Sequence, residues 1–359
     1  MGPRRRAGIY QSCRHIAAAD SPPLPAVGGT ALRSIRLCGG LRRSTLYDPI
    51  SARDGSCGDA GAVAVPGVVN PAAGELVIRG RRPARDRALV MAIVNRTPDS
   101  FYDRGATFGG DAARAAIHRA VAEGADMVDI GGVAASPGDE VDVEEEIRRV
   151  VPTVEWIRAQ YPDVVISVDT WRHEVGAAAC RAGADLLNDA WAAADPLLID
   201  VAAEFGAGYV CTHAGGREPR AEPARPAYAD VVTTVLDATV RLAELAEAKG
   251  VPRGGIVIDA TGFGKNTADH LELLRHVPRF VETGWPVLMA LSNKTFIGET
   301  LGVGLEQRLW GTLAATAIAA QAGVRVFRAH DVEPTRHALE MVASIFGDRS
   351  AARASEWIA

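Results

Sequence analysis

A short apolar segment at 92–94 runs directly into polar side chains, within the sequence MAIVNRTPDSF of residues 91–101. The segment is partly β-branched, which is typical of a buried strand. It ends at Asn95, and the Thr-Pro-Asp sequence at 97–99 then forms a turn. Parallel α/β folds build binding sites in this way, from an amide, a hydroxyl and a carboxylate that a buried strand delivers to one edge.

The same arrangement recurs at seven further apolar segments, each of which ends in polar residues. The residues in this position are Asn95, Asp129, Asp169, Thr170, Asn188, Asp189, His213, Asp259, Ser292, Asn293, Lys294, Arg328 and His330. Together they supply acceptors, amides and cations. Such a ring suits a small, planar, hydrogen-bonding ligand with an anionic tail.

Taken singly, these residues have structural explanations. An aspartate such as Asp169 or Asp259 often caps the helix that follows a strand, and His213 or His330 could be an ordinary buried histidine. Asp129 precedes two glycines and is expected to satisfy backbone groups, so we leave it outside the site. Polar residues at nearly every strand end are nevertheless hard to explain as caps, because buried polar groups need partners.

Strand-like and helical patterns alternate from residue 88 onward, and they must position this ring. The apolar segments cover 88–95, 126–131, 164–169, 185–189, 207–212, 255–259, 285–291 and 324–328. The helical patterns cover 111–123, 142–159, 172–182, 195–205, 228–249, 268–282, 305–322 and 332–346. Eight uninterrupted units in about 250 residues predict a closed (β/α)8 TIM barrel, with a doubly wound sheet as the alternative.

Residues 1–74 differ in composition from the remainder of the chain. They are rich in Arg, Gly, Pro, Ser and Ala without a sustained apolar period, which predicts a disordered extension. The Arg-rich start resembles a transit peptide in composition, but plain disorder or a start codon assigned too far upstream explains it better. We expect the barrel domain to occupy residues 75–359 and to open with a hairpin at about 75–90.

The net charge of −5 is unevenly distributed. Residues 1–90 hold 14 Arg, no Lys and six acidic residues and carry +8, so the remainder carries −13. The acidic body argues against nucleic acid as a partner, and no apolar run is long enough to span a membrane. Five cysteines without CxxC spacing indicate neither a zinc site nor a disulfide framework and favour a cytoplasmic setting.

Seven motifs give the chain a resemblance to the dihydropteroate synthase family over about residues 88–346. They are NRTPDSF (95–101), DIGG (129–132), SVDT (167–170), AGADLLND (182–189), DATGFGK (259–265), SNKTFIG (292–298) and RAHDV (328–332). The family patterns are close to NVTPDSF, DIGGESTRPG, SIDT, AGAxxIND, DPGFGFGK, SRKxFIG and RVHDV. The resemblance implies a TIM barrel that condenses dihydropterin pyrophosphate with p-aminobenzoate and releases pyrophosphate.

The resemblance also implies roles for individual residues. Those that would bind the pterin ring are Asp169, Asn188, Asp259, Phe263 and Lys294. Those that would bind pyrophosphate are Asn95, Arg328 and His330, with Mg²⁺ held at Asn95. The acceptor pocket would contain Ser292 and Asn293. Catalysis would depend on Asn95, Lys294, Arg328 and His330, mainly through stabilisation of the departing anion. Family members commonly dimerise, which implies a homodimer with the helix at 305–322 as a candidate face.

Four departures from the family pattern put the reaction in question. Val-Ala-Ala-Ser at 133–136 stands where the family has Glu-Ser-Thr-Arg, and Asn293 replaces an arginine. The motif at 259–265 is one residue shorter, and Arg96 replaces a valine. We therefore expect a retained pterin pocket with weak or lost synthase activity, which resembles the divergent second-paralogue branch of the family.

Three alternatives to this expectation stay open. The first is a fully active synthase in which Arg96 replaces the missing groups. The second is another pterin-dependent barrel enzyme, of the methyltransferase type. The third is a non-catalytic pterin-binding protein.

Overall fold

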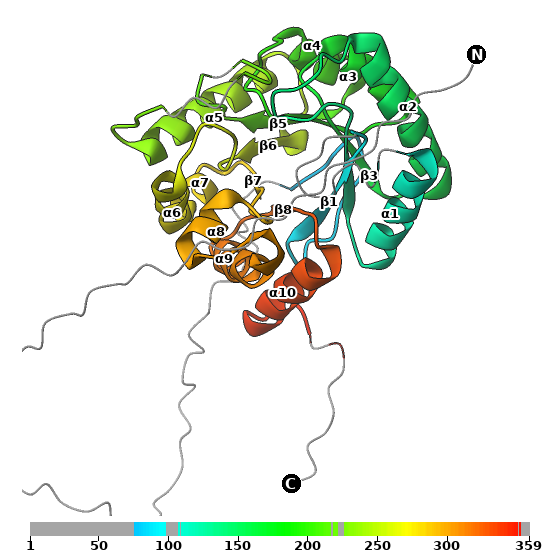
Figure 1. Cartoon of the computed structure of the whole chain (residues 1–359). Helices are drawn as coiled ribbons and strands as arrows, with labels where there is room; N and C mark the ends of the chain where they lie inside the picture. The colour runs from blue at the N-terminus through cyan, green and yellow to red at the C-terminus, as the bar shows by residue number, and fades with distance from the viewer. Residues whose placement is uncertain are drawn as a thin grey trace, which may run out of the picture. The chain divides into compact units, whose positions relative to one another are not determined.

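Eight parallel strands close into a barrel in the computed structural model, which describes residues 75–97, 107, 109–216, 218–221, 226–350 and 352. The strands follow chain order around the barrel (Figure 1). They are β1 (Leu89–Asn95), β2 (Met127–Gly131), β3 (Val165–Asp169), β4 (Leu186–Asp189), β5 (Gly208–Thr212), β6 (Ile256–Asp259), β7 (Val287–Met289) and β8 (Val326–Ala329). The predicted (β/α)8 barrel is confirmed. The predicted disorder of residues 1–74 lies outside the described residues.

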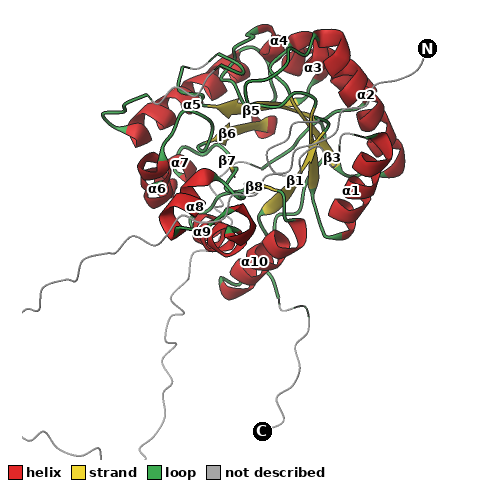
Figure 2. Cartoon of the chain, in the orientation of Figure 1, coloured by secondary structure: helices red, strands yellow, loops and turns green. Residues whose placement is uncertain are grey.

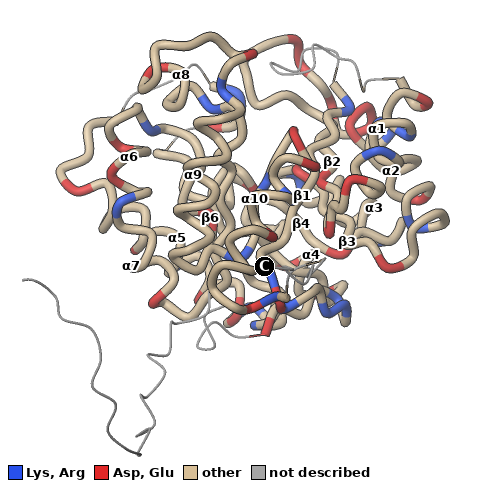
Figure 3. The backbone as a smooth tube through the Cα atoms, turned by 90° about the horizontal axis from the view of Figure 1, so that it is seen from below, with Lys and Arg blue, Asp and Glu red and all other residues tan. Residues whose placement is uncertain are grey.

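Helices form an outer layer around the strands (Figure 2). They are α1 (Gly110–Ala122), α2 (Val143–Gln160), α3 (His173–Ala182), α4 (Leu197–Phe205), α5 (Val231–Ala248), α6 (Thr267–Arg275), α7 (Val277–Val281), α8 (Thr295–Leu301), α9 (Leu309–Gln321) and α10 (Val332–Ile345). Basic and acidic positions are interspersed around this layer (Figure 3). Among the described helices, none combines the length and the apolarity of a membrane span.

Two of the predicted elements differ in the structure. The helix expected over 268–282 is divided into α6 and α7 at His276, because Pro278 lies at the start of α7 and cannot continue the hydrogen-bond ladder of α6. The hairpin expected over 75–90 is reduced to one antiparallel bridge between Ile78 and Arg81. The Val77 N–H donates to the Gly254 carbonyl at 2.8 Å, so this segment bonds to the barrel instead of to a second strand.

Inward-facing residues fill the lower part of the barrel with apolar side chains. One buried cluster contains a residue from each strand: Met91, Met127, Val165, Leu186, Val210, Val257, Leu288 and Val326. Side chains alternate between the two faces of a strand, so the residue two positions further along also points inward. On six of the eight strands that residue is polar, and these residues form the floor of the site: Asp129, Ser167, Asn188, Thr212, Asp259 and Arg328. On β1 the next inward residue, Asn95, is also polar.

Ion pairs lie at the opposite end of the barrel, where the strands begin. Asp126 precedes β2 and pairs with Arg336 and with Arg87. Asp185 precedes β4, pairs with Arg158 and accepts a hydrogen bond from the Ile166 N–H at 2.9 Å. Arg336 also donates to the carbonyls of Ala88 and Gly124. These contacts join α2 and α10 to the strands.

Candidate active site

A cavity of about 410 Å³ opens at the carboxyl ends of the strands. Nine of the ten residues that the sequence assigns to a site line it. They are Asn95, Asp169, Asn188, Asp259, Phe263, Ser292, Lys294, Arg328 and His330. The roles expected for them stay predictions, but their convergence on one cavity is a structural finding.

Strand register places part of this set in one row across the barrel. Asn95 pairs with Gly131, Gly131 with Asp169, and Asp169 with Asn188. A Cβ atom added at Gly131 would lie 3.8 Å from both the Asn95 Oδ1 and the Asp169 Cβ atoms. The glycine therefore lets an amide and a carboxylate converge over β2.

The floor of the cavity is organised by Arg328 on β8. Its Nε atom lies 2.6 Å from the Asp129 carboxylate, and its Nη2 atom lies 2.9 Å from that of Asp169. Asp129 also accepts from Asn188 Nδ2 at 3.1 Å and from Ser167 Oγ at 2.5 Å. Asp169 and Asn188, both predicted to bind the pterin ring, are thus held by one network of side chains around the buried Asp129.

Asp129 is central to this network, and the expectation that it satisfies backbone groups was wrong. Its side chain is fully buried and bonds to three other side chains. The two glycines that follow it are the reason for that expectation. Asp129 lies two residues after the inward-facing Met127, so the period-2 pattern could have identified it.

Burial raises the pKa of the Asp169 carboxyl to about 7, although the neighbouring Arg328 guanidinium opposes that rise. The side chain is 27% exposed, through the cavity. A carboxyl group whose pKa lies near neutral pH can change its charge when a ligand enters the cavity.

Asp259 and Lys294 meet at Thr261. Asp259 Oδ1 accepts from the Thr261 N–H at 2.7 Å and from its hydroxyl at 2.8 Å, and the Lys294 ammonium donates to the Thr261 carbonyl. Burial lowers the pKa of Lys294 to about 8, and attraction to Asp259 opposes this shift. The lysine therefore carries its charge at neutral pH and faces the cavity beside a carboxylate.

The upper wall of the cavity is aromatic, and of its three rings the sequence predicted only Phe263 as a site residue. Trp191 stacks on Phe263 with ring centres 4.6 Å apart, and Trp171 lies edge-on to Trp191 at 6.3 Å. All three rings line the cavity. We refer to Trp171, Trp191 and Phe263 as the aromatic wall.

Asp189 at the end of β4 positions Trp191. Its carboxylate accepts from the Trp191 N–H at 2.8 Å, from the Ala193 N–H at 2.6 Å and from the Tyr209 hydroxyl at 2.5 Å. The turn between them holds Ala192 and Ala193 at positive φ. The strand-end aspartate of β4 therefore serves the loop, whereas the neighbouring Asn188 serves the floor.

Lys265 positions Phe263, although the loop is one residue shorter than the family pattern. Its ammonium donates to the carbonyls of His213, Gly262 and Phe263 at 3.0–3.1 Å. Gly262 permits this close packing, since an added Cβ atom would lie 2.6 Å from the His213 carbonyl oxygen. Burial lowers the pKa of Lys265 to about 7.

The loop after β2 contributes Val133, Ala134, Ala135, Ser136 and Pro137 to the cavity. None of these side chains carries a charge. Arg220 donates to the carbonyls of Ser136 at 3.2 Å and Asp139 at 2.6 Å, so its guanidinium is engaged with the backbone of the same loop. The family has an arginine in this loop. Among the described residues of the loop after β2, none that lines the cavity supplies a guanidinium.

Asn293 is the predicted site residue that the structure places elsewhere. Its backbone is left-handed, with a φ of 56°, and its side-chain amide donates to Asp331 at 2.9 Å. Its carbonyl accepts from Arg308 at 2.8 Å. Asn293 is buried and does not line the cavity, whereas its neighbour Ser292 does and bonds to the His330 N–H at 3.2 Å.

Arg96 is a described residue but is not part of the cavity lining. Its backbone N–H donates to the Gly131 carbonyl at 2.7 Å, and burial together with Arg149 and Arg114 lowers the pKa of its guanidinium. The structure thus gives no support to the idea that Arg96 replaces the missing loop groups.

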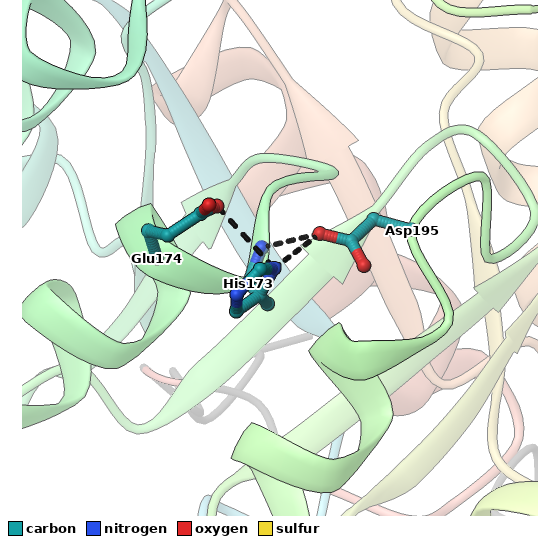
Figure 4. Close-up of side chains that lie close together, drawn as sticks. All are labelled: His173, Glu174 and Asp195. Atoms are coloured by element: carbon teal, nitrogen blue, oxygen red, sulfur yellow. Dashed lines mark hydrogen bonds and ion pairs between the residues drawn. The ribbon is translucent and has the colours of Figure 1, made fainter.

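One described group of potential metal ligands lies outside the cavity, at the start of α3 (Figure 4). The Asp195 carboxylate bonds to the backbone N–H of His173 at 2.9 Å and to its Nδ1 atom at 2.7 Å, and Glu174 lies 3.3 Å from the same nitrogen. Asp195 also accepts from the Leu197 N–H, and its hydrogen bond raises the pKa of His173. These contacts are those of a helix cap that joins α3 to α4.

Comparison with known proteins agrees with this geometry. The model of the pterin-binding enzyme family matches residues 91–330. "Inactive dihydropteroate synthase 2" of Mycobacterium leprae is 62% identical over 279 residues, which cover 76% of this chain and 96% of the relative. A solved Mycobacterium tuberculosis structure, Rv1207, is 50% identical and has a TM-score of 0.61, covering 77% of this chain and 99% of its own. Xanthomonas albilineans dihydropteroate synthase, solved with 4-aminobenzoic acid, is 42% identical with a TM-score of 0.69, covering 76% and 98%.

Proposed function

The chain belongs to the pterin-binding enzyme family, and on this premise we propose that it is a dihydropteroate synthase homologue of the folate pathway that binds the pterin but condenses it with p-aminobenzoate weakly or not at all. The observation that carries the proposal is the convergence of Asp169, Asn188, Asp259 and Lys294 on one cavity. Two carboxylates and an amide would accept from the amino and ring N–H groups of a pterin, and the lysine would donate to its acceptor edge.

The pyrophosphate would lie beside the floor of the cavity. Asn95, Arg328 and His330 line that region. Arg328 uses Nε and Nη2 on the two aspartates, so Nη1 would be the atom that donates to a phosphate oxygen. Phe263 in the aromatic wall would stack on the pterin ring, and Ser292 would help to position His330.

Mg²⁺ fits this site when the substrate supplies most of its ligands. Asn95 offers an amide oxygen, whereas the carboxylates of Asp129 and Asp169 already bind Arg328. Magnesium usually takes few protein oxygens together with substrate phosphates and water. Asn95 would hold the ion, which would supply charge neutralisation of the departing pyrophosphate. Asn95, Lys294, Arg328 and His330 are therefore the proposed catalytic residues.

The condensation step is the part that we propose to be impaired. Val133–Ser136 lacks the hydroxyl and the guanidinium of the family loop, and the Asn293 side chain bonds to Asp331. Loss of one preorganised electrostatic group typically costs about 2.7–4 kcal/mol of barrier. The name of the 62% identical relative, an inactive dihydropteroate synthase 2, supports the same direction.

Two measurements on the full chain test the proposal. Calorimetry with 6-hydroxymethylpterin should give saturable binding, and a steady-state assay with dihydropterin pyrophosphate, p-aminobenzoate and Mg²⁺ should give a kcat well below the ordinary enzyme range of about 1–10³ s⁻¹. Turnover within that range would identify a competent synthase. Binding without any product would favour a non-catalytic pterin-binding protein, and methyl transfer with a corrinoid partner would favour a methyltransferase.

A homodimer through α9 and α10 is part of the proposal. Trp310 and Ile318 on α9 are 76% and 60% exposed, and Met341 on α10 is 61% exposed. Large exposed apolar side chains on adjacent helices are typical of protein–protein contacts. Sedimentation equilibrium should give twice the chain mass, and Trp310→Glu should reduce the measured mass to that of the monomer.

The free buried thiols of Cys180 and Cys211 are consistent with the proposed cytoplasmic setting.

A further inference from the structure

We propose that the upper part of the cavity binds an uncharged aromatic ring next to the pterin, in place of an aromatic carboxylate. The inference rests on the proposed pterin binding, which would fill the polar floor. It concerns the class of the second ligand and changes it from an anion to a neutral ring.

Loop residues form this upper part, because loops extend beyond the strand ends of a barrel. We call it the loop layer, and its members are Val133, Ala134, Ala135, Pro137, Trp171, Trp191 and Phe263. Trp191 and Phe263 are stacked 4.6 Å apart, and Asp189 and Lys265 fix their loops from behind. A rigid aromatic and aliphatic surface of this kind attracts a flat ring through apolar contact and offset stacking.

The positively charged side chains that line the cavity already have hydrogen-bond and ion-pair partners at its floor. The described Lys and Arg side chains that line it are Lys294 and Arg328. Lys294 donates to the Thr261 carbonyl, and Arg328 uses Nε and Nη2 on Asp129 and Asp169 at the floor, where its Nη1 would meet pyrophosphate and not a ligand of the loop layer. A carboxylate in the loop layer would therefore lose its hydration without gaining a cation from these residues, which is costly.

Two arginines near the loop layer are also engaged. Arg220 donates to the carbonyls of Ser136 and Asp139 and does not line the cavity. Arg172 pairs with Glu146 at 2.7 Å and donates to the Val141 carbonyl at 2.7 Å. A neutral ring needs neither of these two arginines, whereas a carboxylate in the loop layer would find both of them engaged elsewhere.

A matched pair of probes tests the inference by calorimetry. At pH 8, p-aminobenzamide is neutral and p-aminobenzoate is an anion of nearly the same shape. With the pterin floor saturated by 6-hydroxymethylpterin, the full chain should bind p-aminobenzamide at least tenfold more tightly than p-aminobenzoate. Equal affinity, preference for p-aminobenzoate or no binding of either probe at millimolar concentration would overturn the inference.

Variants locate the effect in the loop layer. Ser136→Arg adds a guanidinium at the rim and should reverse the preference, whereas Ser136→Gln, which adds a larger polar side chain without charge, should keep it. Trp191→Ala should weaken p-aminobenzamide about tenfold, and Trp191→Phe should restore most of that loss. Preference unchanged by Ser136→Arg, or full affinity in Trp191→Ala, would place the ring elsewhere and refute the inference.

Failure of the proposed function has a different signature. If 6-hydroxymethylpterin does not bind in the first titration, the pterin assignment fails by itself. The same two probes are then titrated without pterin. A preference for the amide supports the loop-layer inference independently, and its absence refutes it.

Discussion

Two aspartates three residues apart, one directly before β2 and one within it, bind arginines at opposite ends of the barrel. Asp126 pairs with Arg336 where the strands begin, and Asp129 pairs with Arg328 where they end. Arg336 also donates to two backbone carbonyls and is 6% exposed, whereas Arg328 has a second carboxylate as its partner and is 19% exposed, through the cavity.

The difference shows what separates a structural ion pair from a site. At the lower end, guanidinium groups join strands to helices and have backbone partners that no ligand can replace. At the upper end, Arg328 contacts Asp129 and Asp169 and faces open space. An ion pair of this kind can redistribute its contacts when a charged ligand arrives, so the same chemistry serves stability at one end and binding at the other.

The largest expected effect is loss of stability at the lower end. Asp185 is 2% exposed, pairs with Arg158 and Arg81 and accepts from the Ile166 N–H. Asp185→Ala leaves these donors without their carboxylate and should lower the free energy of unfolding by about 3–5 kcal/mol in urea denaturation. Arg275→Ala, which breaks an exposed pair with Glu272, should cost less than about 1 kcal/mol. Similar losses in both variants would contradict the comparison.

The next effect belongs to the upper end. Asp259→Ala removes an acceptor of the proposed pterin contact and leaves ring donors buried without a partner. Affinity for 6-hydroxymethylpterin should fall about 100-fold, or about 2.7 kcal/mol, with a smaller loss of stability than Asp185→Ala causes. Asp200→Ala, which breaks an exposed pair with Lys249, is the control and should bind normally. Undiminished affinity in the Asp259 variant would remove the pterin assignment.

Sequence reasoning reached the upper end because that end follows local rules. Strand periodicity and the restriction of barrel sites to carboxyl strand ends brought Asn95, Asp169, Asn188 and Asp259 to one cavity, as the register shows. Asp129 obeys the same periodicity, although the two glycines after it predict an aspartate that binds backbone groups.

Other features depend on contacts that no local pattern encodes. The Asn293 side chain points to Asp331 because its left-handed backbone is held by Arg308, which directly precedes α9, and by Thr312 within α9. The aromatic wall depends on a turn that Asp189 stabilises after β4. In both places, partners from distant or irregular segments decide where a side chain points, and sequence spacing alone could not reveal it.

The pH dependence of pterin affinity should show an effect of intermediate size at the upper end of the barrel. The raised pKa of Asp169, about 7, means that the carboxylate is lost as pH falls below 7. Since the pterin N–H groups need a charged acceptor, affinity should fall about tenfold per pH unit below 7. The pKa of Lys294, about 8, predicts a second decline above pH 8 as its charge is lost. Calorimetry from pH 5.5 to 9 checks both limbs, and Asp169→Asn should abolish the acid limb alone. An acid limb that persists in Asp169→Asn would assign it to another group.

The smallest expected effect is a gain of synthase activity at the rim of the cavity. Ala135→Thr with Ser136→Arg restores the hydroxyl and guanidinium of the family loop at residues that line the cavity. Because Val133 and Ala134 still differ from the family loop, the pair should recover only part of the lost barrier reduction and raise the rate of dihydropteroate formation by up to about tenfold. Addition of Asn293→Arg should contribute little, because residue 293 has a left-handed backbone and directs its side chain to Asp331. A product assay on both variants separates the contributions. If Asn293→Arg gave the larger gain, the side chain at 293 would have to turn into the cavity, and the upper end would be far more adaptable than its ion pairs and capped loops imply.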